Sequence, residues 1–382
     1  MKRLLVPLLC CAWTLASASS AAARVYISPS GSDSSSCSSA HPCRSFSRAY
    51  RVASPGETVI VRGGTYGGQT IPRISRTSLR NVVFRPPAGA RVVVGGSGVN
   101  VYGRHVTFRN MRFAGGWYAK PGSSDVTFRA IRTKDLFITS ASNIRVIGGA
   151  VGPGRGEDYD SQIKSASAGA RPPTNILIDR VFFHDWFRPA GSGDHTECLQ
   201  IGSGVNVTIR RSRFKNCATH DVFIRSWGRG FPLRRFRIEN NFFDETLDGY
   251  YSLKISEQAG IVCRDFLIRN NSALQNMFWQ CRGDNVRFFS NLQPSMPSYA
   301  CSAMRADGAR FAYNVFRRGV RCGSTNRLAS LGFVDPAHFD LRLRAGAPAI
   351  NRGHPFNYPR LDIQGQRRPK GVRADAGADE RA

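Results

Sequence analysis

VTFRNMRF (106–113), VTFRAIRT (126–133), ILIDRVFF (176–183) and VTIRRSRF (207–214) are four copies of a short pattern that recurs along the chain. Each copy begins with alternating apolar and polar residues, which is the pattern of a half-buried β-strand. Related octets begin at residues 144, 236, 266, 286 and 309, and neighbouring copies start 18 to 32 residues apart. That distance suits one coil of two or three short strands with turns. The repeat therefore predicts a parallel β-helix over about residues 55–345.

Asparagine recurs just after the strand of several octets, at Asn110, Asn240, Asn270, Asn291 and Asn314. Side chains of successive coils stack about 4.8 Å apart in a β-helix, so these amides are expected to form a structural hydrogen-bonded ladder. A propeller and a two-sheet sandwich are the other all-β architectures. Short strands of constant length in coils of variable length favour the solenoid over both.

The open N-terminal end of a solenoid needs a cap, because its first strands would otherwise have unpaired backbone groups. Phe46, Ala49, Tyr50 and Ala53 have the spacing of one helix face. A short capping helix is therefore predicted within residues 44–53, ahead of a first strand in PGETVIVRGGTY (55–66).

Both ends of the chain also carry a family resemblance. VYISPSGSD (25–33) and HPCRSFSRAYRVASPGETVIVRGGTYGGQTI (41–71) resemble the N-terminal entry of secreted β-helix proteins of the pectate lyase-like superfamily. LRAGAPAINRGHP (343–355) and LDIQGQRRPKGVRADAGADE (361–380) resemble their C-terminal segment, with departures at Asn351 and Asp379. With the octets, the resemblance covers nearly all of residues 24–382. It implies an all-β chain with a single right-handed parallel β-helix domain over that range, and says little about the chemistry.

Residues 1–23 have the pattern of a secretory signal peptide. Lys2 and Arg3 precede the apolar stretch Leu4–Leu15, and small residues with an A-x-A pattern precede Arg24. The apolar stretch is too short to span a bilayer, and no later segment contains 18 consecutive apolar residues. A secreted, extracellular protein without a membrane span is expected.

The cysteine count agrees with export. Ten cysteines are present, of which Cys10 and Cys11 lie in the signal segment, and the even number that remains indicates disulfides. Cys198–Cys217 is a weaker pair, because the coil alignment sets these two residues out of register. No C-x-x-C pair indicates a zinc or redox site. The favoured neighbouring pairs are Cys37–Cys43, Cys263–Cys281 and Cys301–Cys322.

The formal net charge of +28 predicts a polyanionic partner. Basic residues are spread along the chain instead of forming one run, which favours an acidic polysaccharide over nucleic acid. Most of them are Arg, so genomic base composition alone is an alternative explanation of the charge. The protein is expected to be a monomer.

The coils in the middle of the chain are the longest. Octets there start 29 to 32 residues apart, against 18 to 23 elsewhere. Added length on consecutive coils builds loops on one side, and such loops form a groove. The segments concerned are residues 148–175, 184–206, 215–235 and 244–265. The carboxylates expected to supply hard oxygen ligands to Ca²⁺ are Asp158, Asp160, Asp194, Glu197 and Asp221.

Three of these coils contain a second strand that can be aligned, as TECLQIG (196–202), THDVFIR (219–225) and YYSLKIS (250–256). The alternation of a strand then separates core positions from outer positions. The predicted core stack is Leu199, Val222 and Leu253. The predicted outer ladder is Gln200, Phe223 and Lys254, extended by Lys164 of SQIKS (161–165). A second outer ladder is expected from Cys198, Asp221 and Ser252.

This outer face suits cleavage of a uronic acid polymer by β-elimination. A base removes the proton alpha to the carboxylate, whose charge is neutralised by Ca²⁺ or Arg. Lysine can be the base where positive neighbours and desolvation lower its pKa. We expect Lys254 to be the base, with Lys164 second and His195 third. The expected substrate contacts are Gln200, Phe223, His220 and Tyr251.

Two other functions stay open. A glycoside hydrolase or an epimerase would need acidic side chains, and Asp194, Glu197 and Asp221 are the available ones. The NTD, DD, GHG and RIK set of polygalacturonases is absent, as are the vWiDH and RxPxxR patterns of the commonest pectate lyases. The other hypothesis is a non-catalytic glycan-binding or cell-surface protein, in which His195 and His220 only stack. The sequence does not distinguish pectin, alginate and sulfated glycans.

Overall fold

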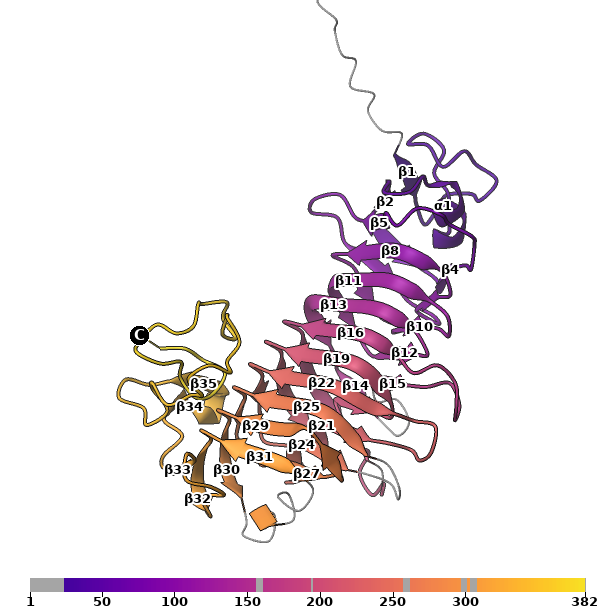
Figure 1. Ribbon diagram of the computed structural model, residues 1–382. Helices are drawn as coiled ribbons and strands as arrows, with labels where there is room; N and C mark the ends of the chain where they lie inside the picture. Colours follow the sequence, from indigo (N-terminus) through magenta and orange to yellow (C-terminus); the bar gives the residue numbers. More distant parts are fainter. Residues whose placement is uncertain are drawn as a thin grey trace, which may run out of the picture.

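The protein forms an elongated right-handed parallel β-helix in the computed structural model, which describes residues 24–155, 161–193, 195–256, 262–296, 301–302 and 308–381 (Figure 1). Coils stack along the long axis, and a complete coil places strand segments on three faces. Two faces are hydrogen-bonded together as a 24-stranded sheet, and the third is a separate 9-stranded parallel sheet. The predicted fold class is confirmed.

The strands follow one another in the same order in each coil. The first face contains β1 (Val25–Ile27), β2 (Thr58–Val61), β5 (Val82–Arg85), β8 (Arg104–Arg109), β11 (Ser124–Thr133), β13 (Ser142–Val151), β16 (Thr174–Asp179), β19 (Gly204–Arg210), β22 (Leu233–Glu239), β25 (Cys263–Arg269), β28 (Gly283–Asp284), β29 (Val286–Phe289) and β31 (Ala309–Ala312). The second face contains the ends of β11 and β13 together with β3 (Gly64–Tyr66), β6 (Val92–Val94), β9 (Arg112–Phe113), β14 (Gly154–Arg155), β17 (Phe182–Phe187), β20 (Arg213–Cys217), β23 (Phe242–Phe243), β26 (Ser272–Ala273), β30 (Leu292–Met296), β32 (Val315–Gly319) and β33 (Arg327–Leu328). The third face contains β4 (Gln69–Ile71), β7 (Val99–Val101), β10 (Trp117–Ala119), β12 (Leu136–Thr139), β15 (Gln162–Lys164), β18 (Leu199–Ile201), β21 (His220–Arg225), β24 (Tyr251–Ser256) and β27 (Met277–Gln280).

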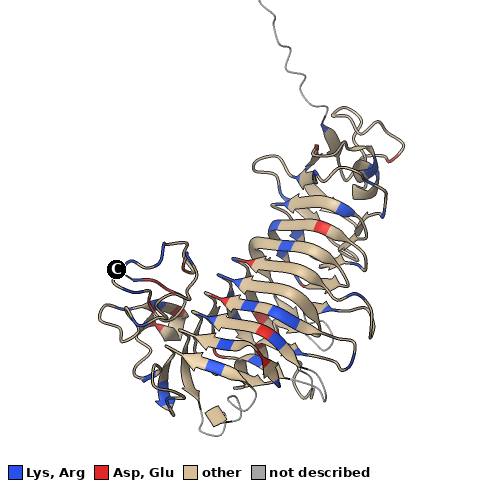
Figure 2. Cartoon of the chain, viewed as in Figure 1, with Lys and Arg blue, Asp and Glu red and all other residues tan. Residues whose placement is uncertain are grey.

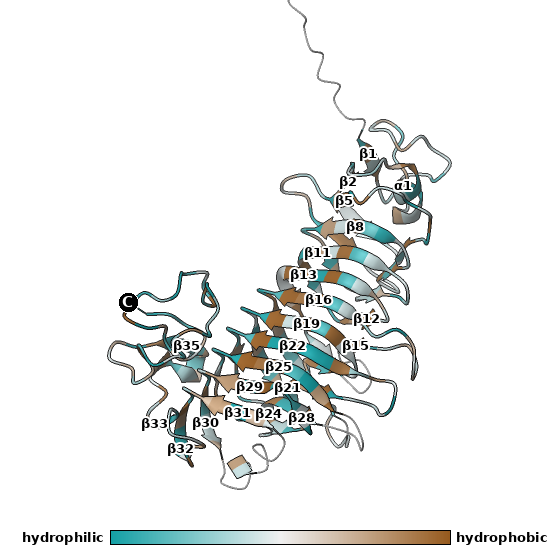
Figure 3. Ribbon diagram, viewed as in Figure 1, coloured by the Kyte–Doolittle hydropathy of each residue, from teal (hydrophilic) through white to brown (hydrophobic). Residues whose placement is uncertain are grey.

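The octets found in the sequence are the strands of the first two faces. Their first apolar residues share one register, in which Val106 pairs with Val126, Val126 with Ile144, and so on through Ile176 and Val207. These side chains are at most 1% exposed, so they form a continuous core stack. Figure 3 shows the hydrophobic positions recurring from coil to coil on these strands.

Aromatic rings fill the core at both ends of the solenoid. Near the N-terminus, the ring centroids of Phe84 and Phe108, and of Phe108 and Phe128, are 5.4 Å apart. Further along, Phe236 and Phe266 stack at 4.6 Å with nearly parallel planes. Stacking of like on like is what identical register in successive coils produces.

An asparagine ladder is present, but three of its predicted members were wrong. Each buried side-chain amide donates from Nδ2 to Oδ1 of the next one at 3.0 or 3.1 Å. Asn110, Asn240 and Asn270 precede the ladder position and take left-handed backbone conformations, with φ of 56°, 54° and 50°. In the NN pairs the first residue makes the turn, and the second enters the core. The ladder consists of Asn241, Asn271, Asn291, Asn314 and Asn326.

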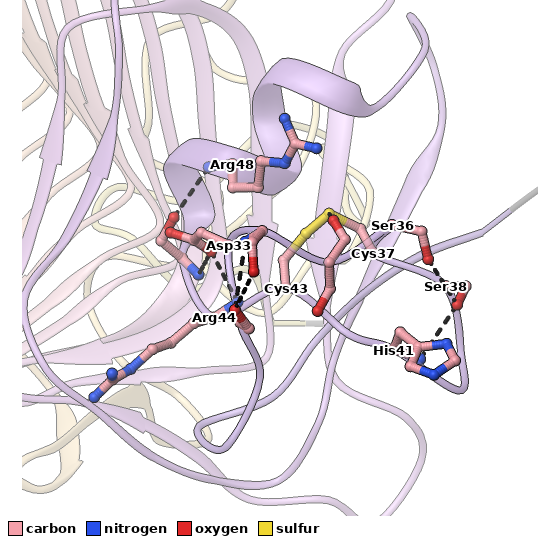
Figure 4. Close-up of a disulfide and its surroundings, with 12 residues drawn as sticks. Asp33, Ser36, Cys37, Ser38, His41, Cys43, Arg44 and Arg48 are labelled. Carbon is pink, nitrogen blue, oxygen red and sulfur yellow. Dashed lines mark hydrogen bonds between the residues drawn. A yellow bond between two sulfur atoms is a disulfide. The ribbon is translucent and has the colours of Figure 1, made fainter.

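The predicted N-terminal cap is confirmed. Helix α1 (Phe46–Val52) buries Phe46, Ala49 and Tyr50 against the first coils, and the Ser45 hydroxyl caps it by accepting a hydrogen bond from Arg48 N–H. Asp33 accepts hydrogen bonds from the backbone N–H groups of Arg44 and Ser45, both at 2.9 Å, beside the Cys37–Cys43 disulfide (Figure 4).

The C-terminal segment packs beside the last coils instead of continuing the solenoid (Figure 1). It includes β34 (Phe333–Asp335), the 3-10 helix η1 (Pro336–His338) and β35 (Asp340–Leu343), which pairs antiparallel with β34. Arg368 and Glu380 form a fully buried ion pair at 2.9 Å. Asn270 Nδ2 donates to the Asp375 carbonyl at 3.0 Å, which ties the segment to the turn beside the asparagine ladder.

Four disulfides are present. The three favoured pairs are confirmed, and the pair considered weaker, Cys198–Cys217, is also bonded. Its residues lie on different faces of adjoining coils, so strand register does not measure their distance. Residues 1–23, which hold the predicted signal peptide, lie outside the described residues. Within the described part of the chain, no helix has the length and apolar character needed to cross a membrane.

Candidate functional site

The third face presents a straight row of outward side chains, one from each strand of the 9-stranded sheet. The predicted alignment of Gln200, Phe223 and Lys254 is confirmed, and Phe278 follows Lys254 in the next coil. Parallel register explains the row, because each coil repeats the same in-and-out alternation. The complete row is Thr70, Asn100, Tyr118, Phe137, Gln162, Gln200, Phe223, Lys254 and Phe278.

The prediction that Lys164 belongs to this row was wrong. Gln162 pairs with Gln200, so Lys164 lies two residues beyond the row position. The Nζ atom of Lys164 instead lies 5.1 Å from the ring centroid of Trp227. Lys164 follows Gln162 by two residues on the same strand, so strand alternation alone does not distinguish the two positions, and only the pairing with Gln200 sets the register.

The predicted second outer ladder was also wrong. Cys198, Asp221 and Ser252 are completely buried. They lie at the corner where the chain enters the third face, and there the side chains turn inward. Burial raises the pKa of Asp221 well above its ordinary value, and the nearby carboxyl of Asp244 raises it further. A carboxyl that is completely enclosed in the interior is not placed to bind a calcium ion, which needs six to eight oxygen ligands.

Three of the predicted site residues do come together at the edge of this face. One ligand atom each of His195, Glu197 and His220 lie within 4.8 Å of one another. His195 Nδ1 is 3.6 Å from Glu197 Oε1, and the His195 side chain is 61% exposed whereas that of Glu197 is 0% exposed. The two imidazole ring centroids are 6.5 Å apart.

The two histidines have opposite electrostatic surroundings. Interaction with the Glu197 carboxylate raises the pKa of His195. Burial lowers the pKa of His220 to about 4. His220 is 1% exposed, and its Nδ1 lies 3.1 Å from the Tyr251 carbonyl oxygen. His220 is therefore a neutral, fixed imidazole at pH 7, and it offers little surface to a sugar.

Lys254 projects from the middle of β24 close to this cluster. Its Nζ lies 5.6 Å from the ring centroid of Phe223 and 5.9 Å from that of Tyr251. Burial lowers the pKa of Lys254, the positive charge of Arg225 lowers it further, and the Glu197 carboxylate opposes both effects. The amine is therefore easier to deprotonate than an ordinary lysine, as a general base requires.

The aromatic side chains around Lys254 differ in their accessibility. Phe223 is only 5% exposed, so its ring supports Lys254 and His220 and does not form an open platform. Tyr250 is 48% exposed. Tyr251 and Phe278 are partly exposed and stack at 4.9 Å, and both line a cavity of about 270 Å³. These three rings are the accessible apolar surface of the site.

Sequence reasoning missed Arg225 and Phe278. Arg225 is the last residue of THDVFIR, and its positive charge acts on both Lys254 and His195. Its outward position follows from the same alternation that places Phe223. Phe278 was missed because MFWQ (277–280) lies in a short coil outside the block of long ones.

The predicted calcium ligands do not form a calcium site among the described residues. Asp158, Asp160 and Asp194 lie outside that part of the chain. Glu197 stands between two imidazoles, and Asp221 is buried at a corner. Calcium binds six to eight oxygen ligands, whereas the cluster among the described residues offers one buried carboxylate and two nitrogen donors, which does not fit.

Positive charge is distributed along the whole solenoid. Figure 2 shows Lys and Arg on strands and turns from the first coils to the last, without one dominant patch. This agrees with the spread of basic residues seen in the sequence.

No family model matches the sequence, and no curated protein matches it. Among solved structures, the chain is similar to the crystal structure of pectate lyase Pel9A, with a TM-score of 0.57 and 16% identity over 94% of this chain and 96% of that one. It is also similar to XylC in complex with xylose, with a TM-score of 0.49 and 8% identity over 93% and 98% of the two chains. The likeness to this pectate lyase agrees with the right-handed parallel β-helix fold of the described residues.

Proposed function

We propose that this protein is a secreted, monomeric polysaccharide lyase that cleaves an acidic, uronic-acid-containing polymer by β-elimination, with Lys254 as the base. The observation that carries the proposal is the setting of Lys254. Its amine is on a rigid strand, in a row of outward side chains, partly desolvated and close to the positive charge of Arg225. The likeness to a pectate lyase adds support at the level of the fold.

In the proposed reaction, Arg225 binds the carboxylate of one uronate unit and stabilises the charge that develops on it. The neutral amine of Lys254 takes the proton alpha to that carboxylate. The electron pair of the broken C–H bond forms the carbon–carbon double bond, and the glycosidic C–O bond breaks with its electron pair leaving on oxygen. Water protonates the leaving oxygen. A calcium ion would need Asp158, Asp160 and Asp194, so we assign no step to it.

Several groups in the third face are suited to hold the chain of sugars. Tyr250, Tyr251 and Phe278 offer ring faces on which a sugar can pack. Gln200 is partly exposed one coil before Phe223 and supplies a donor and an acceptor for sugar hydroxyls. Lys164 is too far from the row position of Lys254 to share its role, so it is not proposed as a base.

One observation favours the second candidate, a glycan-binding protein without catalysis. Tyr118 and Phe137 stack at 5.2 Å on the same face, and Lys120 Nζ lies 4.7 Å from the Tyr118 ring. This aromatic and basic patch belongs to earlier coils than Lys254, and it would bind an acidic polymer without any reaction.

The test is to incubate the mature protein with polygalacturonate, alginate and chondroitin sulfate, and to follow the ultraviolet absorbance of the unsaturated product. Absorbance that depends on Lys254 supports the lyase. New reducing ends without absorbance would indicate a hydrolase, and binding without either product would indicate the glycan-binding protein. Lys215→Ala is the matched control, because it also removes a lysine from a strand, but on the second face and away from the row of Lys254.

A further inference from the structure

We propose that His195, Glu197 and His220 bind a divalent transition-metal ion of the zinc class. The three side chains come from neighbouring coils at one edge of the third face. β18 pairs with β21 through Leu199 and Val222. The same register, followed toward the start of both strands, sets Glu197 beside His220. His195 precedes Glu197 by two residues, a spacing that returns a side chain to the same side of an extended chain.

The distances suit a small ion. His195 Nδ1 and Glu197 Oε1 are 3.6 Å apart. Two ligands of a tetrahedral zinc ion with bonds of 2.0–2.2 Å are about 3.3–3.5 Å from each other. All three ligand atoms lie within 4.8 Å of one another, so movements of about 1 Å complete the geometry. The exposed His195 side chain is the one free to make them.

The surroundings of His220 are those of a metal-bound histidine. Ligating histidines usually hydrogen-bond through their second ring nitrogen to a carboxylate or a backbone carbonyl, which fixes the ring. His220 Nδ1 lies 3.1 Å from the Tyr251 carbonyl oxygen, which leaves Nε2 as the nitrogen for a ligand. Phe223 packs on the same ring at a centroid distance of 5.1 Å and holds it further.

The donor set selects the metal. Two imidazoles and one carboxylate suit zinc and its neighbours, whereas calcium requires oxygen ligands in larger number. The carboxylate of Glu197 is completely buried beside the two imidazoles, so it is held in place as a ligand. Because the His195 side is exposed to solvent, a fourth position stays open to water or to a substrate oxygen, as in catalytic zinc sites.

Binding of the ion does not depend on the proposed lyase activity. Its use there, as a Lewis acid next to the substrate carboxylate, rests on the proposed function. The two proposals therefore need separate readouts, and a direct measurement of metal binding provides one that does not involve turnover.

The experiment is isothermal titration of the metal-stripped full-length mature protein with Zn²⁺, in the presence and absence of excess Ca²⁺. We expect one bound equivalent that calcium does not displace, and a Co²⁺-loaded form with the visible absorption of a tetrahedral site. His195→Ala, which changes an exposed side chain, should weaken Zn²⁺ binding at least about 100-fold, more than the loss of a mere orienting partner. Glu197→Gln should do the same, with circular dichroism as the check on folding.

His184→Ala is the matched control. His184 Nδ1 lies 2.8 Å from Asp185 Oδ2, so it is a histidine–carboxylate pair on another face, and its loss should leave the zinc equivalent intact. Equal binding by His195→Ala and the unaltered protein, or displacement of Zn²⁺ by Ca²⁺, would overturn the proposal and leave a hydrogen-bonded cluster with a structural role. Zinc binding without unsaturated product would support the zinc site and contradict the lyase activity. Unsaturated product without zinc binding would support the lyase activity and contradict the zinc site.

Discussion

Replacing Asn271 with Ala should destabilise the protein more than any substitution of an exposed amide. The Asn271 side chain takes part in four hydrogen bonds of 2.8–3.0 Å: it accepts from the backbone N–H and the Nδ2 of Asn241, and it donates to the Ile238 carbonyl and to Asn291 Oδ1. Asn271 is 0% exposed, so water does not replace these partners. At about 0.5–1.5 kcal/mol for each bond, the loss of the four bonds is about 2–6 kcal/mol.

The control is Asn143→Gly, because Asn143 has a φ of 55° and glycine tolerates this left-handed conformation whereas alanine does not. Asn143 lies in an exposed ladder, where it donates to Asp125 and accepts from Asn175, both at 2.9 Å. Water can take over both bonds, and surface substitutions of this kind usually change stability by less than about 0.5 kcal/mol. The measurement is reversible urea unfolding of both variants, followed by tryptophan fluorescence. A loss below about 1 kcal/mol for Asn271→Ala, or equal losses for the two variants, would refute the assignment of stability to the buried ladder.

Four further outcomes are expected. Lys254→Ala should lower the rate of unsaturated-product formation at least about 100-fold, which is the smaller effect typical of a lost general base, while Lys215→Ala keeps most of the rate. Similar rates in both variants would exclude Lys254 as the base. The neutral amine of Lys254 is the active form, and the pKa of Lys254 lies below the ordinary 10.5, so the rate should rise with pH and level off below that value. Arg225→Gln should move this rise to higher pH, because the positive charge of Arg225 lowers the pKa of Lys254. An unmoved profile would show that Arg225 does not act on the base. Burial raises the pKa of Asp135 to about 6. Folding stability from this group is therefore present below pH 3.8 and lost as pH rises to about 6, so Asp135→Asn should be about 2–3 kcal/mol more stable than the unaltered protein at pH 7 in thermal or urea unfolding, with no gain at pH 4. Binding to polyuronates should weaken steeply with salt, since screening acts within about 8–10 Å at physiological ionic strength, and salt-independent binding in a sedimentation assay would contradict a charge-driven contact.

Strand positions could be predicted from the sequence where one face of each strand is buried. Val106, Val126 and Ile176 each lie in a strand in which buried and outward residues alternate. A shift of the pairing by one residue would expose all the buried ones, so the pattern determines the register. The same logic placed Gln200, Phe223 and Lys254 correctly in one row.

Turns and corners were less predictable, because their conformation depends on contacts from other coils. Asn240 and Asn241 are the same residue type in adjacent positions, and only the backbone conformation of the first decides which of them enters the core. Asp221 was expected outside because strict alternation was assumed from the first residues of β21, whereas the side chain of Asp221 is completely buried at the start of that strand. Glu197 and His220 were assigned separate roles, since their proximity depends on the pairing of two strands 23 positions apart.

The disulfides have a consequence for how the chain is made. The eight cysteines after residue 23 form four disulfides, each between two cysteines that follow one another in the sequence. Their separations are 6, 19, 18 and 21 residues. Eight cysteines permit 105 pairings, and this is the pairing that arises when a chain is oxidised from its N-terminus onward as it leaves a membrane pore. Under the proposed secretion, export alone would sort the cysteines, and the native bridges would form without a reshuffling enzyme.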